Sequence, residues 1–282
     1  MKFEVYSEVQ YTVFNPSTFI FNVHALRTSN QAVLSESLRL DPYLRIEEFH
    51  ASTGANRFVR VQVDEPMTFK ISYNATVDTM YKIFDEHEEI QGVPVVKLDG
   101  DTIPFLFPSR YCQSDKLQRL AFNQFGRIEN VFAKVMAITD WIHNHVEYLS
   151  GSSNSQTSAY DTITERAGVC RDFAHLGIAL CRALSIPARY FTGYSFKLSP
   201  PDFHACFEAY IGGHWIIFDA TRLAPLNGLV KIATGRDAAD AAIASIFGNV
   251  ICNSIKVGCD SLENSFKPYY YDPNKLEGLS YQ

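Results

Sequence analysis

The sequence predicts an α+β protein: an N-terminal antiparallel β-sandwich, followed by helices packed on an antiparallel sheet. Apolar and polar residues alternate over residues 3–14, with the period of a half-buried strand. Apolar residues then recur at helical spacing along residues 128–142. A length of 282 residues suits two domains. We place the boundary at residue 100, which gives a β domain over 1–100 and a core with a C-terminal tail over 101–282.

The first domain is predicted from short strands separated by polar turns, which is typical of a β-sandwich. The expected strands cover residues 3–14, 19–26, 57–63 and 67–77. No group of residues within them suggests chemistry. The periodicity is lost between residues 88 and 109, where Pro94, Gly100, Pro104 and Pro108 interrupt the chain.

The second domain is predicted to begin with helices and to continue with strands. A polar loop covers residues 151–158, and an amphipathic helix begins near Cys170 and ends before Pro187. Three strands are expected at 188–196, 204–211 and 214–220, and a last helix at 236–247, before an irregular tail.

Cys170 is the most informative residue, because it lies where a glycine-containing turn meets a helix. Free N–H groups and the helix dipole favour a thiolate at that position. A cysteine nucleophile needs a general base and a group that orients the base. His204 and Asp219 are the candidates further along the chain.

The predicted hairpin explains why His204 and Asp219 should meet. Gly212-Gly213 is a two-residue turn signal, which places Ile211 opposite His214 and Cys206 opposite Asp219. His204 lies on the same face as Cys206, so it becomes a diagonal neighbour of Asp219. A carboxylate there fixes the imidazole tautomer, provided that no bulge interrupts the strand.

These positions predict a catalytic triad in which Cys170 attacks an amide carbon, His204 transfers the proton and Asp219 orients His204. The backbone N–H of Cys170 is the first expected oxyanion donor. The second donor stays open among Tyr148, Gln156 and Tyr160.

Four segments, residues 168–174, 186–194, 204–205 and 215–221, resemble the transglutaminase-like superfamily. More narrowly, the chain is similar to the bacterial transglutaminase-like cysteine protease group. This resemblance implies a papain-like core with a Cys-His-Asp triad carried by Cys170, His204 and Asp219, together with an N-terminal β domain.

The chain departs from the family pattern in three places. Cys206 stands where many members have Trp, and Ala220 stands where many have Pro. Arg171 replaces the Trp that commonly follows the nucleophile in calcium-dependent animal transglutaminases. The sequence has no clustered acidic calcium loop, so we expect neither a cofactor nor a metal.

The first hypothesis for function is a cysteine peptidase or amidase. The alternatives are acyl transfer to amines and a non-catalytic binding module. The spacings of Cys and His fit no zinc ligand set. His143 and His145 are two residues apart on a helix and are expected to have structural roles, and Asp237 is expected to complement a helix N-terminus.

Composition narrows the expected partners. A net charge of −6 without a run of Lys or Arg argues against nucleic-acid binding. No apolar run is long enough to predict a membrane span or a signal peptide, and the six cysteines show no disulfide framework. We therefore expect a cytoplasmic protein that acts on a peptide or protein amide. The oligomeric state stays open.

Overall fold

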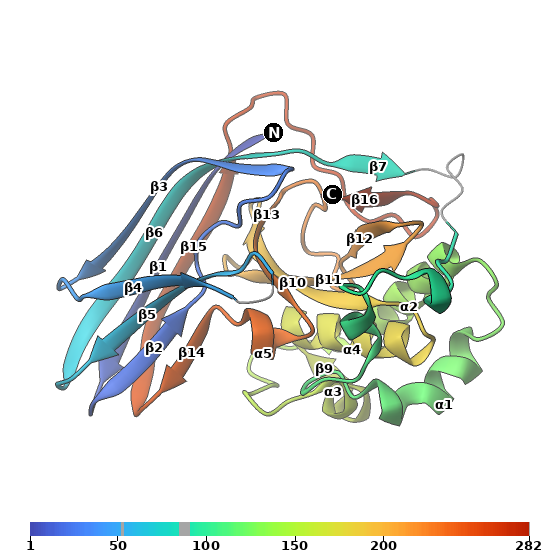
Figure 1. Cartoon of the computed structure of the whole chain (residues 1–282), viewed down its shortest axis with the longest axis horizontal. Helices are drawn as coiled ribbons and strands as arrows, with labels where there is room; N and C mark the ends of the chain where they lie inside the picture. Colours follow the sequence, from blue (N-terminus) through green and yellow to red (C-terminus); the bar gives the residue numbers. More distant parts are fainter. Residues whose placement is uncertain (52–53, 85–90, 282) are drawn as a thin grey trace.

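The computed structural model of the chain describes residues 1–51, 54–84 and 91–281. Two four-stranded sheets form one half of the molecule, and a six-stranded sheet with helices forms the other (Figure 1). The predicted α+β class is confirmed. In sheet order, the first four-stranded sheet consists of β15 (Val250–Ser261), β1 (Lys2–Val13), β6 (Met67–Thr79) and β3 (Gln31–Asp41). The second consists of β14 (Ala244–Phe247), β2 (Ser17–Phe21), β5 (Arg57–Val63) and β4 (Ile46–His50).

Alternating burial along the strands creates the apolar interior of the first half. In β1 every second residue from Phe3 onward is buried, as a strand with one covered face requires. Tyr11, Phe19 and Phe69 pack together in this interior, with ring centroids 5.0–5.7 Å apart. These aromatic contacts join the two sheets into the predicted sandwich.

The second half consists of one antiparallel sheet covered by helices. The sheet order is β13 (Leu229–Gly235), β10 (Ala188–Ser195), β11 (His204–Ile211), β12 (His214–Phe218), β16 (Gly278–Ser280) and β7 (Lys82–Phe84). A small parallel pair joins β8 (Glu147–Tyr148) to β9 (Ala167–Gly168). The helices are α1 (Ser114–Phe125), α2 (Val131–His145), α3 (Ala159–Glu165), α4 (Cys170–Ala183) and α5 (Ala238–Ala241), with short 3₁₀ turns at Val95–Lys97 and Ile103–Leu106.

Helix α4 lies almost wholly inside the protein and packs on β11. Helix and sheet are close together at Gly177, where an added Cβ would lie 2.5 Å from the ring of Phe207. Only glycine allows this separation of helix and strand. The contact sets the position of the N-terminus of α4 relative to β11.

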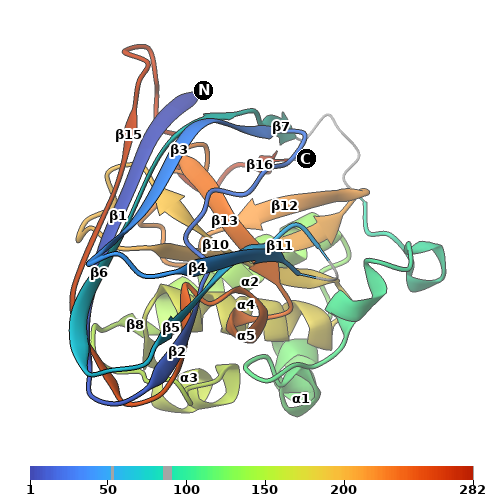
Figure 2. The same cartoon turned by 60° about the vertical axis from the view of Figure 1, so that its left-hand side comes forward.

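The last third of the chain returns to the β-sandwich. Strand β14 pairs with β2 (Figure 1). Strand β15 pairs with β1 along most of its length (Figure 2). The helix predicted over 236–247 is therefore wrong beyond one turn, because α5 ends at Ala241 and β14 begins at Ala244. The domain boundary at residue 100 stays a prediction. The strand pairing shows that β14 and β15 belong to the N-terminal sheets and that β7 belongs to the core sheet.

Two side-chain amides connect the halves along the outer edge of β13. Gln31 donates to the carbonyl of Lys231 at 2.8 Å and accepts from its N–H at 2.7 Å. Asn56 makes the same pair of bonds with Thr234, at 2.8 and 3.1 Å. These amides satisfy backbone groups of β13 that an edge strand would otherwise leave open.

Within the described residues, no helix combines the length and the apolar character needed to cross a membrane. The cytoplasmic location stays a prediction from the sequence.

Candidate active site

Cys170 is the first residue of α4 and is partly exposed. The turn before it is held by Asp172, whose carboxylate accepts the N–H of Val169 at 2.9 Å. A Cβ at Gly168 would lie 2.7 Å from the Cβ of Asp172, so this position needs a glycine. The local sequence therefore places the thiol at a helix N-terminus, as predicted.

His204 and Asp219 meet as the hairpin argument requires. The register pairs Ile211 with His214 and continues to Phe207 opposite Phe218 without a bulge. Nε2 of His204 donates to Oδ2 of Asp219 at 2.9 Å, and both side chains are 1% exposed. The second ring nitrogen, Nδ1, is thereby left for the thiol.

The carboxylate of Asp219 is fully engaged. Oδ1 accepts from the N–H and the hydroxyl of Thr221 at 2.9 and 2.7 Å. Oδ2 accepts from the N–H of Ala224 at 3.1 Å in addition to His204. These bonds hold the carboxylate in one orientation and stabilise its charged form.

The electrostatics of the pair favour an imidazolium next to a carboxylate. Burial lowers the pKa of His204, but the charge of Asp219 and the hydrogen bond that Asp219 accepts from His204 raise it well above its ordinary 6.5. Burial raises the pKa of Asp219, but the His204 charge and the hydrogen bonds outweigh it and lower that pKa below 3.8.

Cys206 lies beside the same pair and makes a cluster with metal-ligand chemistry. One donor atom each from His204, Cys206 and Asp219 lies within 4.8 Å of the others. The Asp219 oxygens are already occupied by four donors, and burial raises the pKa of Cys206 to about 12. The arrangement therefore fits proton transfer better than metal binding, which needs free carboxylate lone pairs and a thiolate.

Of the three candidates for the second oxyanion donor, Tyr148 is the one beside Cys170. Strand β8 pairs Tyr148 with Gly168, two residues before Cys170. The exposed side chain of Gln156 accepts from Arg110 at 3.2 Å. The ring of Tyr160 is 46% exposed and lies under the ammonium of Lys116.

A cavity of about 430 Å³ contains Cys170 and His204. One wall comes from the core sheet and α4, and the opposite wall comes from α5 and β14. The lining residues are Tyr111, Ser155, Cys170, Arg171, Tyr190, Thr192, Phe203, His204, Ala205, Ala238, Ala239, Ala241, Ala242, Ile243, Ala244, Ser245 and Ile246. The volume is in the range of small-ligand and peptide sites.

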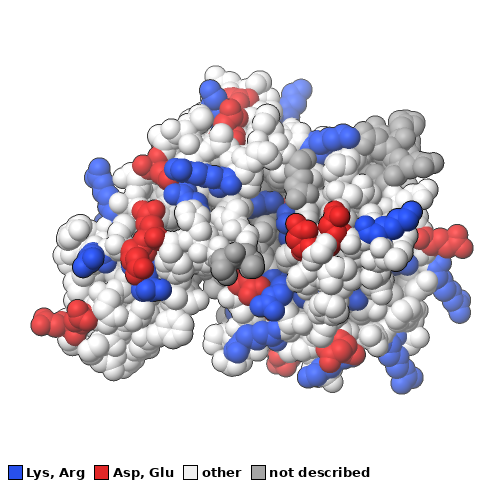
Figure 3. Space-filling model, in the orientation of Figure 1, with Lys and Arg blue, Asp and Glu red and all other residues white. Residues whose placement is uncertain are grey.

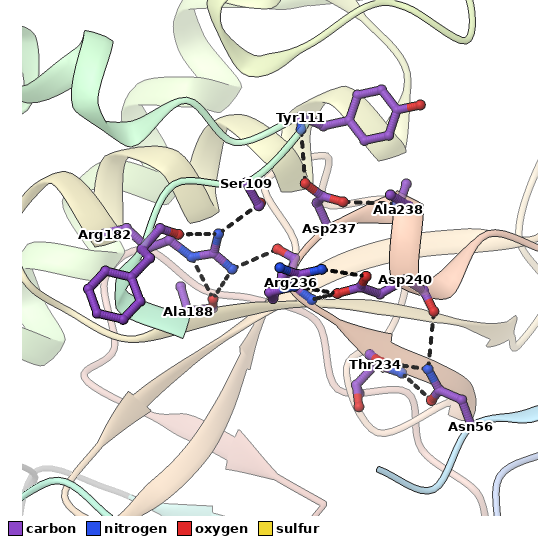
Figure 4. A network of polar contacts seen from close by, with 12 residues as sticks. Asn56, Ser109, Tyr111, Arg182, Ala188, Thr234, Arg236, Asp237, Ala238 and Asp240 are labelled. Atoms are coloured by element: carbon purple, nitrogen blue, oxygen red, sulfur yellow. Dashed lines mark hydrogen bonds and ion pairs between the residues drawn. The ribbon is translucent and has the colours of Figure 1, made fainter. Parts of the chain in front are cut away.

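The segment before β14 is anchored by a polar network (Figure 4). Asp237 accepts from the N–H of Tyr111 at 2.9 Å and from that of Ala239 at 2.9 Å, which confirms its predicted capping role. Arg182, which is buried, donates to the carbonyls of Ala188 and Arg236. The wall of the cavity therefore rests on the core instead of on a free loop.

Two further histidines, His143 and His175, have structural contacts. Nδ1 of His143 donates to the carbonyl of Ala220 at 3.1 Å, beside Asp219. His175 is buried, accepts from the N–H of Ala238 at 3.1 Å and stacks on Tyr111. Neither ring belongs to the cavity that holds Cys170.

The structure thus brings Cys170, His204 and Asp219 together, while their catalytic roles stay a prediction. The wall formed by residues 238–246 does not follow from the sequence, because the pattern of this segment predicts a helix. The signal was present: Ser245-Ile246-Phe247 is followed by Gly248-Asn249, a turn pair that favours a strand end.

The fold and this group of residues define a transglutaminase-like protein with a Cys-His-Asp arrangement. Residues 1–101 match the family described as bacterial transglutaminase, N-terminal domain, and residues 118–220 match the transglutaminase-like superfamily. A crystal structure from Cytophaga hutchinsonii, described as a "Putative Cysteine Protease", is 70% identical and has a TM-score of 0.98. That match covers 100% of this chain and 98% of the other. The chain belongs to the transglutaminase-like superfamily.

Mycobacterial proteins of uncharacterised function show partial similarity. One from Mycobacterium leprae is 29% identical over 116 residues, which cover 38% of this chain and 42% of that protein. One from Mycobacterium tuberculosis is 40% identical over 60 residues, which cover 21% of this chain and 19% of that protein. The matched part is thus less than half the length of either relative.

Proposed function

We propose that the protein is a cysteine-dependent amide hydrolase, a peptidase or amidase, with Cys170 as nucleophile. One observation carries the proposal: Cys170 and His204 share a cavity, and Asp219 holds the far nitrogen of His204. The similarity to the crystal structure described as a "Putative Cysteine Protease" supports the same reaction class.

The proposed reaction has two halves. The Cys170 sulfur forms a bond to the amide carbon, and the tetrahedral oxyanion accepts hydrogen bonds from the Cys170 N–H and Tyr148. The C–N bond breaks as His204 gives its proton to the leaving amine, which leaves a thioester. Water, deprotonated by His204, then attacks the thioester, and the products are a carboxylic acid and the free thiol.

Acyl transfer differs only in the second half, where an amine replaces water. Acidic and basic side chains are interspersed over the described part of the face in Figure 3, so the surface charge there does not favour an amine over water. The choice between the two acceptors therefore depends on the cavity. Hydrolysis is the outcome favoured when no dedicated amine site excludes water.

The experiment is to incubate the protein with a library of acetylated peptide amides, with and without a primary alkylamine, and to weigh the products. Hydrolysis gives a mass gain of one water across the cleaved bond, and acyl transfer gives the alkylamide. Cys170→Ala should abolish both, whereas Cys252→Ala, at an exposed cysteine, should leave turnover unchanged. Equal turnover in wild type and Cys170→Ala would overturn the proposal, and absence of turnover in all variants would favour a binding module.

A further inference from the structure

Strand β14 forms an outer edge of its sheet and also one wall of the cavity with Cys170. Among the strands that the structure describes, it pairs with β2 on one side only. Residues 243–246 all line the cavity. The free side of the strand therefore faces the space in which a substrate must lie.

The alternation of hydrogen-bonded and non-hydrogen-bonded pairs between β14 and β2 shows which backbone groups point toward that space. The N–H of Asn22 donates to the carbonyl of Ile243 at 2.8 Å, so these two residues form a hydrogen-bonded pair. In an antiparallel ladder, hydrogen-bonded and non-hydrogen-bonded pairs alternate. The register places Ala244 opposite Phe21, which is therefore a non-hydrogen-bonded pair, and the same holds for Ile246.

The N–H and C=O groups of Ala244 and Ile246 thus point away from β2 and toward the cavity. Within the described part of the chain, neither residue has a backbone hydrogen bond other than those of its own ladder. The adjoining wall residues Ala238, Ala239, Ala241 and Ala242 have small side chains. A second backbone can therefore approach this edge closely.

Within the described residues, the edge also lacks the features that proteins use to block strand pairing, such as Lys, Pro and side chains that bond the open backbone groups. The sequence Ala244-Ser245-Ile246-Phe247 has no charge and no proline. The edge of β13 shows the contrast, because Gln31 and Asn56 occupy its open backbone groups. The segment before β14 is held by the hydrogen bonds of Asp237, so the free edge of β14 is a rigid template.

From these observations we infer that β14 is a substrate-binding strand: an extended segment of a peptide substrate pairs with the free backbone groups of Ala244 and Ile246 and so presents its amide to Cys170. This inference rests on the proposed function and adds the substrate class, an extended unfolded peptide. Backbone pairing supplies affinity with little dependence on sequence, and the alanine-lined wall favours uncharged side chains.

The test compares a peptide electrophile with a small one on the same cysteine. Acetyl-trialanine chloromethyl ketone and 2-chloroacetamide both alkylate a thiol with loss of chloride, and only the first has a backbone that can pair. The ratio of the two second-order rate constants at Cys170, followed by mass spectrometry, measures the benefit of pairing. We expect Ile246→Pro, which removes an outward N–H, to lower this ratio roughly 3- to 10-fold.

Ile255→Pro is the matched control. The N–H of Leu262 donates to Lys2 at 2.9 Å, which makes Ile255 an outward-facing position of edge strand β15. It is 48% exposed, against 39% for Ile246, and does not line the cavity. Ile255→Pro should leave the ratio unchanged, and Ile246→Ala should lower it less than Ile246→Pro.

A second readout needs no variant. The amides of the peptide probe fall into two alternating sets, or frames, of which only one can face β14. In wild-type protein, N-methyl groups on the amides of one frame should lower the alkylation rate roughly 3- to 10-fold per blocked bond, and N-methyl groups on the other frame should not. Equal effects in both frames, or an Ile246→Pro ratio equal to that of Ile255→Pro, would overturn the inference. A wild-type dimer that Ile246→Pro dissociates, with an unchanged ratio, would assign the edge to a second copy of the chain and would also overturn it. If chloroacetamide fails to modify Cys170 in wild type, the proposed function fails as well.

Discussion

Nε2 of His204 and Oδ2 of Asp219 lie 2.9 Å apart in the protein interior, joined across a hairpin whose turn is Gly212-Gly213. The hairpin register brings the two residues together, and the Thr221 and Ala224 contacts hold the carboxylate. The pair is thus prepared before substrate binds, and it leaves Nδ1 of His204 for the thiol of Cys170.

Asp219→Asn should lower kcat by roughly 10²- to 10⁴-fold and change the pH profile. Asp219 raises the pKa of His204, so its removal lowers that pKa. His204 must be protonated to release the amine, and the alkaline limb of the kcat profile should therefore move to lower pH. The measurement is kcat against pH with a peptide amide. Asp260→Asn, at an exposed position, is the control, and an unmoved alkaline limb would contradict the assignment of His204.

The same pair should make stability depend on pH. The pKa of His204 is raised, so its contribution is fully present below about pH 6.5 and is lost as pH rises through the folded-state pKa. The pKa of Asp219 is lowered, so its contribution is present above about pH 3.8 and is lost as pH falls through its folded-state pKa. The free energy of unfolding of wild type should exceed that of Asp219→Asn most between these values. Urea unfolding at pH 5 and pH 9.5 checks this, and a difference that grows at pH 9.5 would be contrary to expectation.

Much of the site was predictable because its determinants are local. The Gly212-Gly213 turn sets the register, and the glycine before Cys170 marks the start of α4. The substrate-facing wall was not predictable in the same way. Residues 236–247 contain five alanines and two aspartates, a composition that suits a helix in isolation. Only pairing with β2, more than 220 residues earlier in the chain, makes 244–247 a strand.

Gly177→Ala should impair both stability and activity. The new Cβ would overlap the Phe207 ring at 2.5 Å, and overpacking of this kind costs about 1–3 kcal/mol. Because this contact sets the distance between α4 and β11, alkylation of Cys170 should also slow. Urea unfolding and thiol labelling measure the two effects. Gly100→Ala, where an added Cβ meets nothing within 4 Å, is the control, and equal unfolding free energies for the two variants would count against this packing role.

Tyr148→Phe should lower kcat about 100-fold with little change in KM, because an oxyanion donor acts mainly in the transition state. Tyr148 pairs with Gly168, two residues before Cys170, and burial raises the pKa of its hydroxyl, so the hydroxyl stays protonated as a donor. Tyr160→Phe, on the exposed side of α3, should behave as wild type. Steady-state kinetics with one peptide amide distinguish the two, and a loss confined to KM would assign Tyr148 to substrate binding instead.

The central claim is that His204 activates the thiol of Cys170. The most direct measurement is the rate of iodoacetamide alkylation of each cysteine between pH 5 and 9, resolved by peptide mass spectrometry, in wild type and in His204→Ala. Cys252 is exposed and is the internal reference, while Cys112, Cys181, Cys206 and Cys259 are buried. We expect Cys170 to react faster than Cys252 at pH 6, and His204→Ala to remove this advantage. A rate for Cys170 equal to that of Cys252, or one that His204→Ala leaves unchanged, would contradict it.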